Sequence, residues 1–199
     1  QTAWWLALFI VPLLVIAHST LGLIFGLQLG RPGWFSALQA PAFVVLAGVS
    51  GMGLIIIIAA ALRSIPRLRE QFPLSTFAWL GNFTWVLLIS YIYLTAVELL
   101  SATYAAGFHE MKLAQELFGG TYAWIFWSSV GLLLISFVML FSQFLRRRYH
   151  LSLIVVAGVL VNLAAMGKRF LIVVPSQTHG TLLPYSPGTY SPTWVEYAI

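Results

Sequence analysis

A run of predominantly apolar residues, LSLIVVAGVLVNLAAMGKRFLIVV, occupies positions 151–174. At about 1.5 Å of rise per residue, a helix over this run reaches about 36 Å, enough to cross a bilayer core of about 30 Å. Comparable runs precede it along the chain, and only 8% of all residues are charged, against about 25% in soluble domains. The sequence therefore predicts an all-α membrane protein.

The apolar runs predict about five transmembrane helices over 4–29, 40–62, 76–105, 122–145 and 151–174, in one transmembrane domain that covers 1–199. Residues 175–199 are predicted to form an external loop that leads to a further helix. Gly22, Gly26 and Gly30 repeat every fourth residue, a spacing that predicts close approach of another backbone. Because the chain opens in one apolar run and ends where another helix is expected, we expect it to be part of a longer protein.

Clusters of cations give the predicted helices an orientation, because short loops rich in Lys and Arg stay on the cytoplasmic side. Two loops carry such clusters, one after the second predicted helix and one after the fourth. Placing both loops on the cytoplasmic side lets all five helices cross the membrane in alternating directions. The loop over 107–120 carries one lysine against two glutamates and is predicted to be external, with MKLAQELF as a short interfacial helix. The cytoplasmic cations are Arg63, Arg67, Arg69, Arg146, Arg147 and Arg148. The formal net charge of +5 therefore reflects topology, and no nucleic-acid partner is expected.

Three ionisable residues lie inside the apolar runs. Lys168 and Arg169 are adjacent, and Glu98 is the only acid in any of these runs. All three are expected about 10–15 Å below the external surface, where an isolated charge is unfavourable and opposite charges compensate one another. The sequence predicts a pair of Glu98 with Lys168 or Arg169. Snorkelling of the cations to the interface and a purely structural ion pair are the alternatives.

Other polar residues of the runs extend this candidate site. Tyr91, Thr95 and Glu98 stand at i, i+4 and i+7 and share one helix face. Asn162 lies seven residues before Arg169, on the same face. His18, at about mid-helix, is either a hydrogen-bonded packing residue or a proton carrier. Trp34, in the connection after the first run, is placed as an interfacial anchor.

The chain contains no cysteine. This excludes a Cys-ligated iron–sulfur cluster and a covalently attached c-type haem within it. No metal site is expected in this chain, so iron–sulfur clusters or haem would belong to partner subunits.

Three separated blocks of sequence resemble the NrfD/PsrC family of polysulfide-reductase-type membrane subunits. They are HSTLGLIFGLQLGRPGWFSALQAPAFVVLAGVSG, then YLTAVELLSATYA with ELFGGTYAWIFW, then KRFLIVVPS with PTWVE. The chain looks most like the membrane subunits of alternative complex III, or of periplasm-facing quinone oxidoreductases of related build. The resemblance implies an eight- to ten-helix bundle in the bacterial cytoplasmic membrane, without a redox centre of its own. It also implies a quinone near the external face, menaquinone being expected, and an adjacent iron–sulfur subunit within a larger complex.

The resemblance carries over His18, Glu98 and Arg169 as catalytic residues, together with the turn at Trp34. Family members often have an acid where this chain has Lys168, and the usual N-terminal helices are missing, so this chain is expected to hold part of the quinone pocket. Quinol oxidation requires a hydrogen-bond partner for each quinol oxygen, and His and Glu suit that role. The full expected quinone-binding set is His18, Trp34, Tyr91, Glu98, Asn162, Lys168 and Arg169.

Two other classes of function remain open. Intramembrane ionisable residues also mark ion paths, so the chain could be a proton channel or an ion transporter. That reading predicts inverted repeats or broken helices, and neither is evident in the sequence. A purely structural membrane anchor for redox partners is the other alternative.

Overall fold

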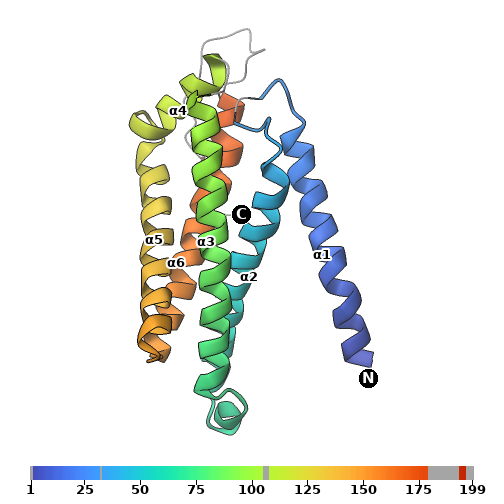
Figure 1. The fold of residues 1–199 in the computed structure, drawn as a ribbon, viewed down its shortest axis with the longest axis vertical. Coiled ribbons are helices and arrows are strands. Elements are labelled where there is room, and N and C mark those ends of the chain that lie inside the picture. Colours follow the sequence, from blue (N-terminus) through green and yellow to red (C-terminus); the bar gives the residue numbers. More distant parts are fainter. Residues whose placement is uncertain (1, 32, 105–107, 179–192, 196–199) are drawn as a thin grey trace.

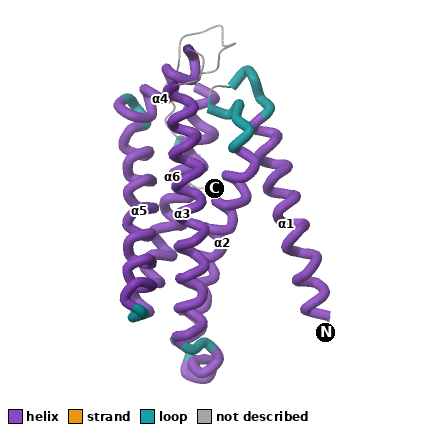
Figure 2. The backbone as a smooth tube through the Cα atoms, in the orientation of Figure 1, coloured by secondary structure: helices purple, strands orange, loops and turns teal. Residues whose placement is uncertain are grey.

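The computed structural model shows a bundle of long helices in which consecutive long helices run in opposite directions (Figure 1). The structure describes residues 2–31, 33–104, 108–178 and 193–195. In this part of the chain the regular secondary structure is helical, without strands (Figure 2). Five of the helices are long and apolar enough to cross a membrane. The predicted all-α membrane fold is therefore confirmed.

The long helices follow the apolar runs closely. Two short elements connect them, the 3-10 helix η1 (Pro66–Gln71) at one end of the bundle and α4 (Phe108–Gly119) at the other. The five long helices are α1 (Thr2–Gly26), α2 (Gln39–Arg63), α3 (Leu74–Tyr104), α5 (Ala123–Arg146) and α6 (Leu151–Thr178).

Two helix ends differ from the predicted ones by more than two residues. The first helix ends at Gly26, followed by a turn in which the amide of Gln28 donates to the carbonyl of Phe25. The last helix continues through Pro175 to Thr178, whose hydroxyl donates to the carbonyls of Val174 and Pro175 at 3.1 Å each. The predicted external loop therefore starts after the helix, and most of it lies outside the described residues.

The core lies between α2, α3, α5 and α6, which pack against one another. Its fully buried side chains include Val49, Ile56, Phe77, Leu88 and Val161, each with an exposed fraction of 0%. These residues come from three different helices, so burial depends on the bundle and not on one amphipathic stripe.

The α1 helix packs against α2 near its C-terminal end and diverges from the bundle toward its N-terminus (Figure 1). A Cβ on Gly22 would lie 2.6 Å from the Cα of Ala40, and one on Gly26 would lie 2.6 Å from the carbonyl oxygen of Ser36. Close backbone approach is thus confirmed at both glycines, although Gly26 meets the loop before α2 and not a helix. Most apolar side chains of α1 are exposed.

The α2 and α6 helices cross at Gly53 and Gly158. A Cβ on Gly53 would lie 2.9 Å from the carbonyl oxygen of Gly158, and one on Gly158 would lie 3.0 Å from that of Gly53. Larger residues would separate the two backbones. This crossing fixes the level of α6 relative to α2.

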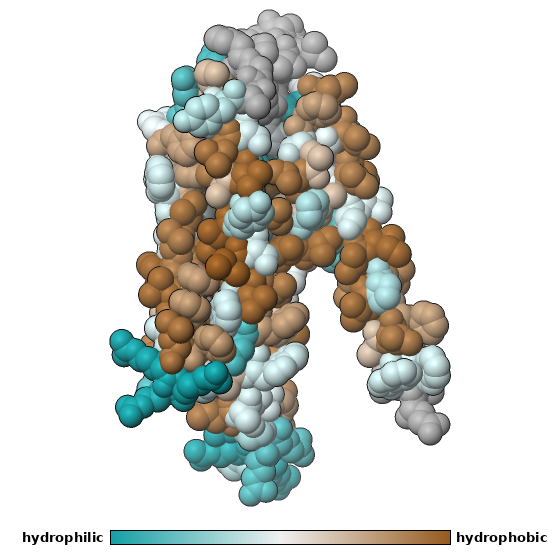
Figure 3. Space-filling model, in the orientation of Figure 1, coloured by the Kyte–Doolittle hydropathy of each residue, from teal (hydrophilic) through white to brown (hydrophobic). Residues whose placement is uncertain are grey.

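The arginine-rich segments lie at one end of the bundle, opposite α4 (Figure 3). Arg63 donates to the carbonyl oxygen of Phe72, which folds the loop after α2 back on its helix. Arg147 ends α5 in the left-handed conformation with a φ of 53°, and its guanidinium lies 5.2 Å from the centroid of the Phe144 ring. Under the positive-inside rule this is the cytoplasmic end.

Candidate functional site

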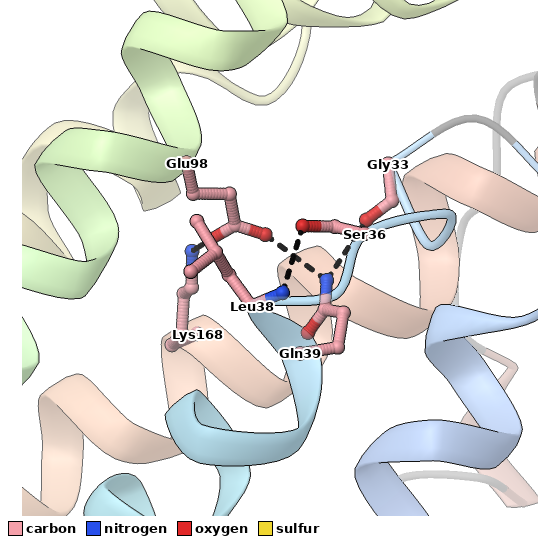
Figure 4. Close-up of polar contacts among 6 residues, drawn as sticks. All are labelled: Gly33, Ser36, Leu38, Gln39, Glu98 and Lys168. Atoms are coloured by element: carbon pink, nitrogen blue, oxygen red, sulfur yellow. Dashed lines mark hydrogen bonds and ion pairs between the residues drawn. The ribbon is translucent and has the colours of Figure 1, made fainter.

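Glu98, near the outer end of α3, accepts a hydrogen bond on each carboxylate oxygen (Figure 4). Lys168 of α6 forms an ion pair with it, with 3.5 Å between Nζ and Oε2. Gln39, the first residue of α2, donates from Nε2 to Oε1 at 3.0 Å. The Lys168 and Glu98 side chains are 17% and 22% exposed. Three helices that are distant in sequence therefore meet at one carboxylate, and we name Gln39, Glu98 and Lys168 the outer carboxylate cluster.

The loop between α1 and α2 holds Gln39 in position. Its Nε2 also donates to the carbonyl oxygen of Gly33 at 3.0 Å, so both amide hydrogens are used. Gly33 has a φ of +78°, and a Cβ there would lie 2.8 Å from Leu113 of α4. The Ser36 hydroxyl accepts from the amide of Leu38 at 3.2 Å and orders the entry to α2. Glycine is needed at position 33 because the backbone is left-handed and closely covered.

Tyr91 lies two turns before Glu98 on α3, and its side chain is 2% exposed. It lies close enough to Lys168, Glu98 and Arg169 to interact electrostatically with all three. The predicted shared face of Tyr91 and Glu98 therefore brings a phenol to the cluster, from the side of the protein core.

Arg169 does not join this cluster, although it follows Lys168 directly. Its Nη2 donates to the hydroxyl of Ser50 on α2 at 3.4 Å. Ser50 lies eleven residues after Gln39 on α2, a separation of about 16 Å along the helix. Of the two cations that were expected to compete for Glu98, Lys168 forms the ion pair among the described residues.

The remaining predicted residues lie elsewhere. On α1, the Nδ1 atom of His18 lies 2.8 Å from the Leu14 carbonyl oxygen of its own helix. Asn162 donates to the Gly158 carbonyl at 2.9 Å, beside the crossing with Gly53. The Trp34 indole donates to the Ile172 carbonyl at 2.5 Å, so it ties the α1–α2 loop to the outer end of α6. The described contacts do not bring these three residues to Glu98, and their assignment to a quinone site stays a prediction.

Gln39 was not among the residues predicted from the sequence. A weak signal was present, because Gln39 is a neutral polar residue immediately before an apolar run, at the same predicted external end as Glu98. A helix that begins at the outer surface places its first side chains level with the last turns of a neighbour that ends there. The helix geometry therefore restricts the level at which a hydrogen-bond partner of Glu98 lies, but it does not specify which residue that partner is.

The cluster combines an acceptor, a cation and hydrogen-bond donors toward the end of the bundle that the positive-inside rule predicts to be external. A carboxylate held at this boundary is suited to accept a proton from a polar group of an amphipathic ligand. A lysine beside it supplies three donors to the same carboxylate or to a ligand oxygen. The arrangement is therefore compatible with proton-coupled chemistry on a membrane-soluble substrate.

Comparison with known proteins identifies relatives of this chain. The family model described as polysulphide reductase, NrfD, matches residues 1–180. A putative dimethyl sulfoxide reductase membrane subunit of Halobacterium salinarum is 30% identical, over 98% of this chain and 48% of its own length. A selenate reductase subunit of Mesobacillus selenatarsenatis is 26% identical, over 83% of this chain and 38% of its own length. The chain thus spans about half or less of these curated relatives. With the family model matched along most of its length, this multi-pass membrane chain belongs to the NrfD polysulphide reductase family.

Proposed function

We propose that this chain is the quinol-binding part of a membrane subunit of a respiratory reductase complex in the bacterial cytoplasmic membrane. The outer carboxylate cluster is the observation that carries the proposal. It joins a carboxylate, a lysine and an amide at the outer end of three membrane helices. A quinol head at this level would lie at the end of the apolar bundle, with its isoprenoid tail among lipid.

The chemistry of the proposed site is proton transfer coupled to electron transfer. Oxidation of one quinol releases two protons and two electrons, and the chain has no cysteine to ligate a cluster that would take the electrons. The electrons would pass to an iron–sulfur subunit on the external face. Glu98 would accept a proton from a quinol hydroxyl, and Lys168 would hold the carboxylate while Tyr91 contributes a further hydroxyl.

The names of the two relatives support electron flow from quinol toward a reductase. Both are described as subunits of reductases, for dimethyl sulfoxide and for selenate. A membrane subunit of such an enzyme would oxidise quinol and deliver its electrons to the reductase. Menaquinol is the first substrate to test, because the family resemblance implies menaquinone. The same resemblance implies assembly in an alternative complex III, whereas the names of the relatives favour assembly in a reductase.

Glu98→Gln tests the proposal in the full complex. The amide keeps a carbonyl acceptor for Gln39 but cannot take up a proton, so assembly should persist while menaquinol-dependent reduction per assembled complex falls at least tenfold. Glu98→Leu should impair assembly as well. Glu70→Gln, on the exposed η1 segment at the opposite end, is the matched control and should retain full turnover.

The same experiment separates the alternative functions. A structural anchor would lose activity only in proportion to assembled complex. A proton channel would conduct protons in vesicles without quinol and would lose that conductance in Glu98→Gln. Turnover equal to that of the unmodified complex would remove Glu98 from the proposed mechanism.

A further inference from the structure

The Arg169 side chain extends toward the centre of the bilayer. Relative to the Gly53–Gly158 crossing, Ser50 lies three residues toward the external end and Arg169 lies eleven. The Cα atoms of Ser50 and Arg169 therefore differ in level by about 12 Å. The hydrogen bond from Arg169 Nη2 to the Ser50 hydroxyl requires an extended arginine side chain that crosses most of this distance.

This direction is the opposite of snorkelling. Side chains of a helix lean toward its N-terminus, and the N-terminus of α6 is at the cytoplasmic end. The guanidinium consequently lies within a few ångströms of the level of Ser50, which is about 10 Å or more inside the level of Gln39 at the start of α2. Phosphate groups of the external leaflet lie outside the hydrocarbon and do not reach this level.

The chain has one carboxylate inside a membrane-spanning helix among the residues that the structure describes, that of Glu98. Its five acidic residues are all glutamates, and four of them lie outside the apolar runs, at positions 70, 110, 116 and 196. The fifth, Glu98, is held by Lys168 and Gln39 at the outer cluster. Ser50 is a neutral partner, and Arg169 is exposed on the bundle surface. An unpaired guanidinium in this environment is costly, and an anion is the partner that would neutralise its charge.

We propose that Arg169 pairs with a carboxylate of a further transmembrane helix that packs over α2 and α6 beside Ser50. Charge complementarity specifies the chemistry of the partner. The matched regions cover only 48% and 38% of the two relatives' own lengths, so those proteins are long enough to contain such a helix outside the matched region. The direct partners of the two cations differ, because Arg169 donates to Ser50 whereas Lys168 pairs with Glu98.

Site-specific photocrosslinking in the full-length protein within its complex tests this pairing. With p-benzoylphenylalanine at position 169, we expect a covalent adduct to a peptide from a transmembrane helix that contains Asp or Glu. Position 163 is the control, since Leu163 is on another face of α6 and 51% exposed, and it should give lipid adducts. Adducts at position 169 to lipid, to quinone or to a helix without an acid would each overturn the proposal.

Charge exchange provides a second test that does not depend on the crosslinker variant. Arg169→Glu should lower the yield of assembled protein at least tenfold, whereas Arg169→Lys should retain most of it. Replacement of the partner acid by Arg in the Arg169→Glu background should restore at least half of the yield. A selection for second-site suppressors of Arg169→Glu identifies that acid independently. Normal assembly of Arg169→Glu, or suppressors that leave every membrane acid unchanged, would contradict the pairing.

Discussion

Gln39 Nε2 donates to Glu98 Oε1 at 3.0 Å, across 59 residues of sequence. Gln39 is 2% exposed and its other amide hydrogen is held by the Gly33 carbonyl. The α1–α2 loop therefore determines where one oxygen of the Glu98 carboxylate lies. Lys168 determines the position of the other oxygen, so the carboxylate is fixed by two elements that join only in the folded bundle.

Gln39→Leu removes both donors while keeping a side chain of similar size. A hydrogen bond to a charged group typically contributes about 1.5–3 kcal/mol, so we expect a loss of about 2 kcal/mol in stability. Thermal unfolding in detergent measures this loss. Gln115→Leu, at an exposed position of α4, is the control and should unfold at the original temperature.

The ion pair of Glu98 and Lys168 should show energetic coupling. Lys168→Met leaves a carboxylate without its cation, and Glu98→Gln leaves a cation without its anion. The double variant removes both charges, so its destabilisation should be smaller than the sum of the single ones, by about 1–3 kcal/mol. A double-mutant cycle of chemical denaturation measures this coupling. Strict additivity would mean that the pair contributes nothing to stability.

Two glycines of α2 provide a matched test of the α2–α6 crossing. A Cβ on Gly53 would lie 2.6 Å from Asn162 Nδ2 and 2.9 Å from the Gly158 carbonyl oxygen, whereas a Cβ on Gly51 would have no neighbour within 4 Å. Gly53→Ala should destabilise the bundle by about 1–3 kcal/mol through overpacking. Gly51→Ala should be neutral or stabilising by up to about 1 kcal/mol, because alanine favours the helix. Equal melting temperatures for the two variants would refute the close crossing.

The predicted topology can be tested with single cysteines, since the sequence has none of its own. Cysteine at position 147 should react with an impermeant reagent only after the cytoplasmic face is opened. Cysteine at position 112, exposed on α4, should react in intact cells. The reverse pattern would invert the orientation inferred from the arginine clusters.

Much of the fold could be predicted from the sequence, because apolar run length decides which segments cross a bilayer. The runs correspond to the five long helices within a few residues at each end, and the largest difference is at Pro175, where the structure continues α6 to Thr178. The candidate site was predicted less completely. Glu98 and a cation were expected to meet and do so through Lys168, while Gln39 was not considered.

The sequence by itself determined the class of fold, the number of apolar helices in this stretch and the approximate level of each charged residue. These properties depend on local composition and on the constant rise of a helix. Only the tertiary structure decided which charged side chains meet. Lys168 and Arg169 are neighbours in the chain, but rotation about the helix axis and the Gly53–Gly158 crossing direct one toward Glu98 and the other toward Ser50. Packing sets that rotation, and packing depends on residues far apart in the sequence.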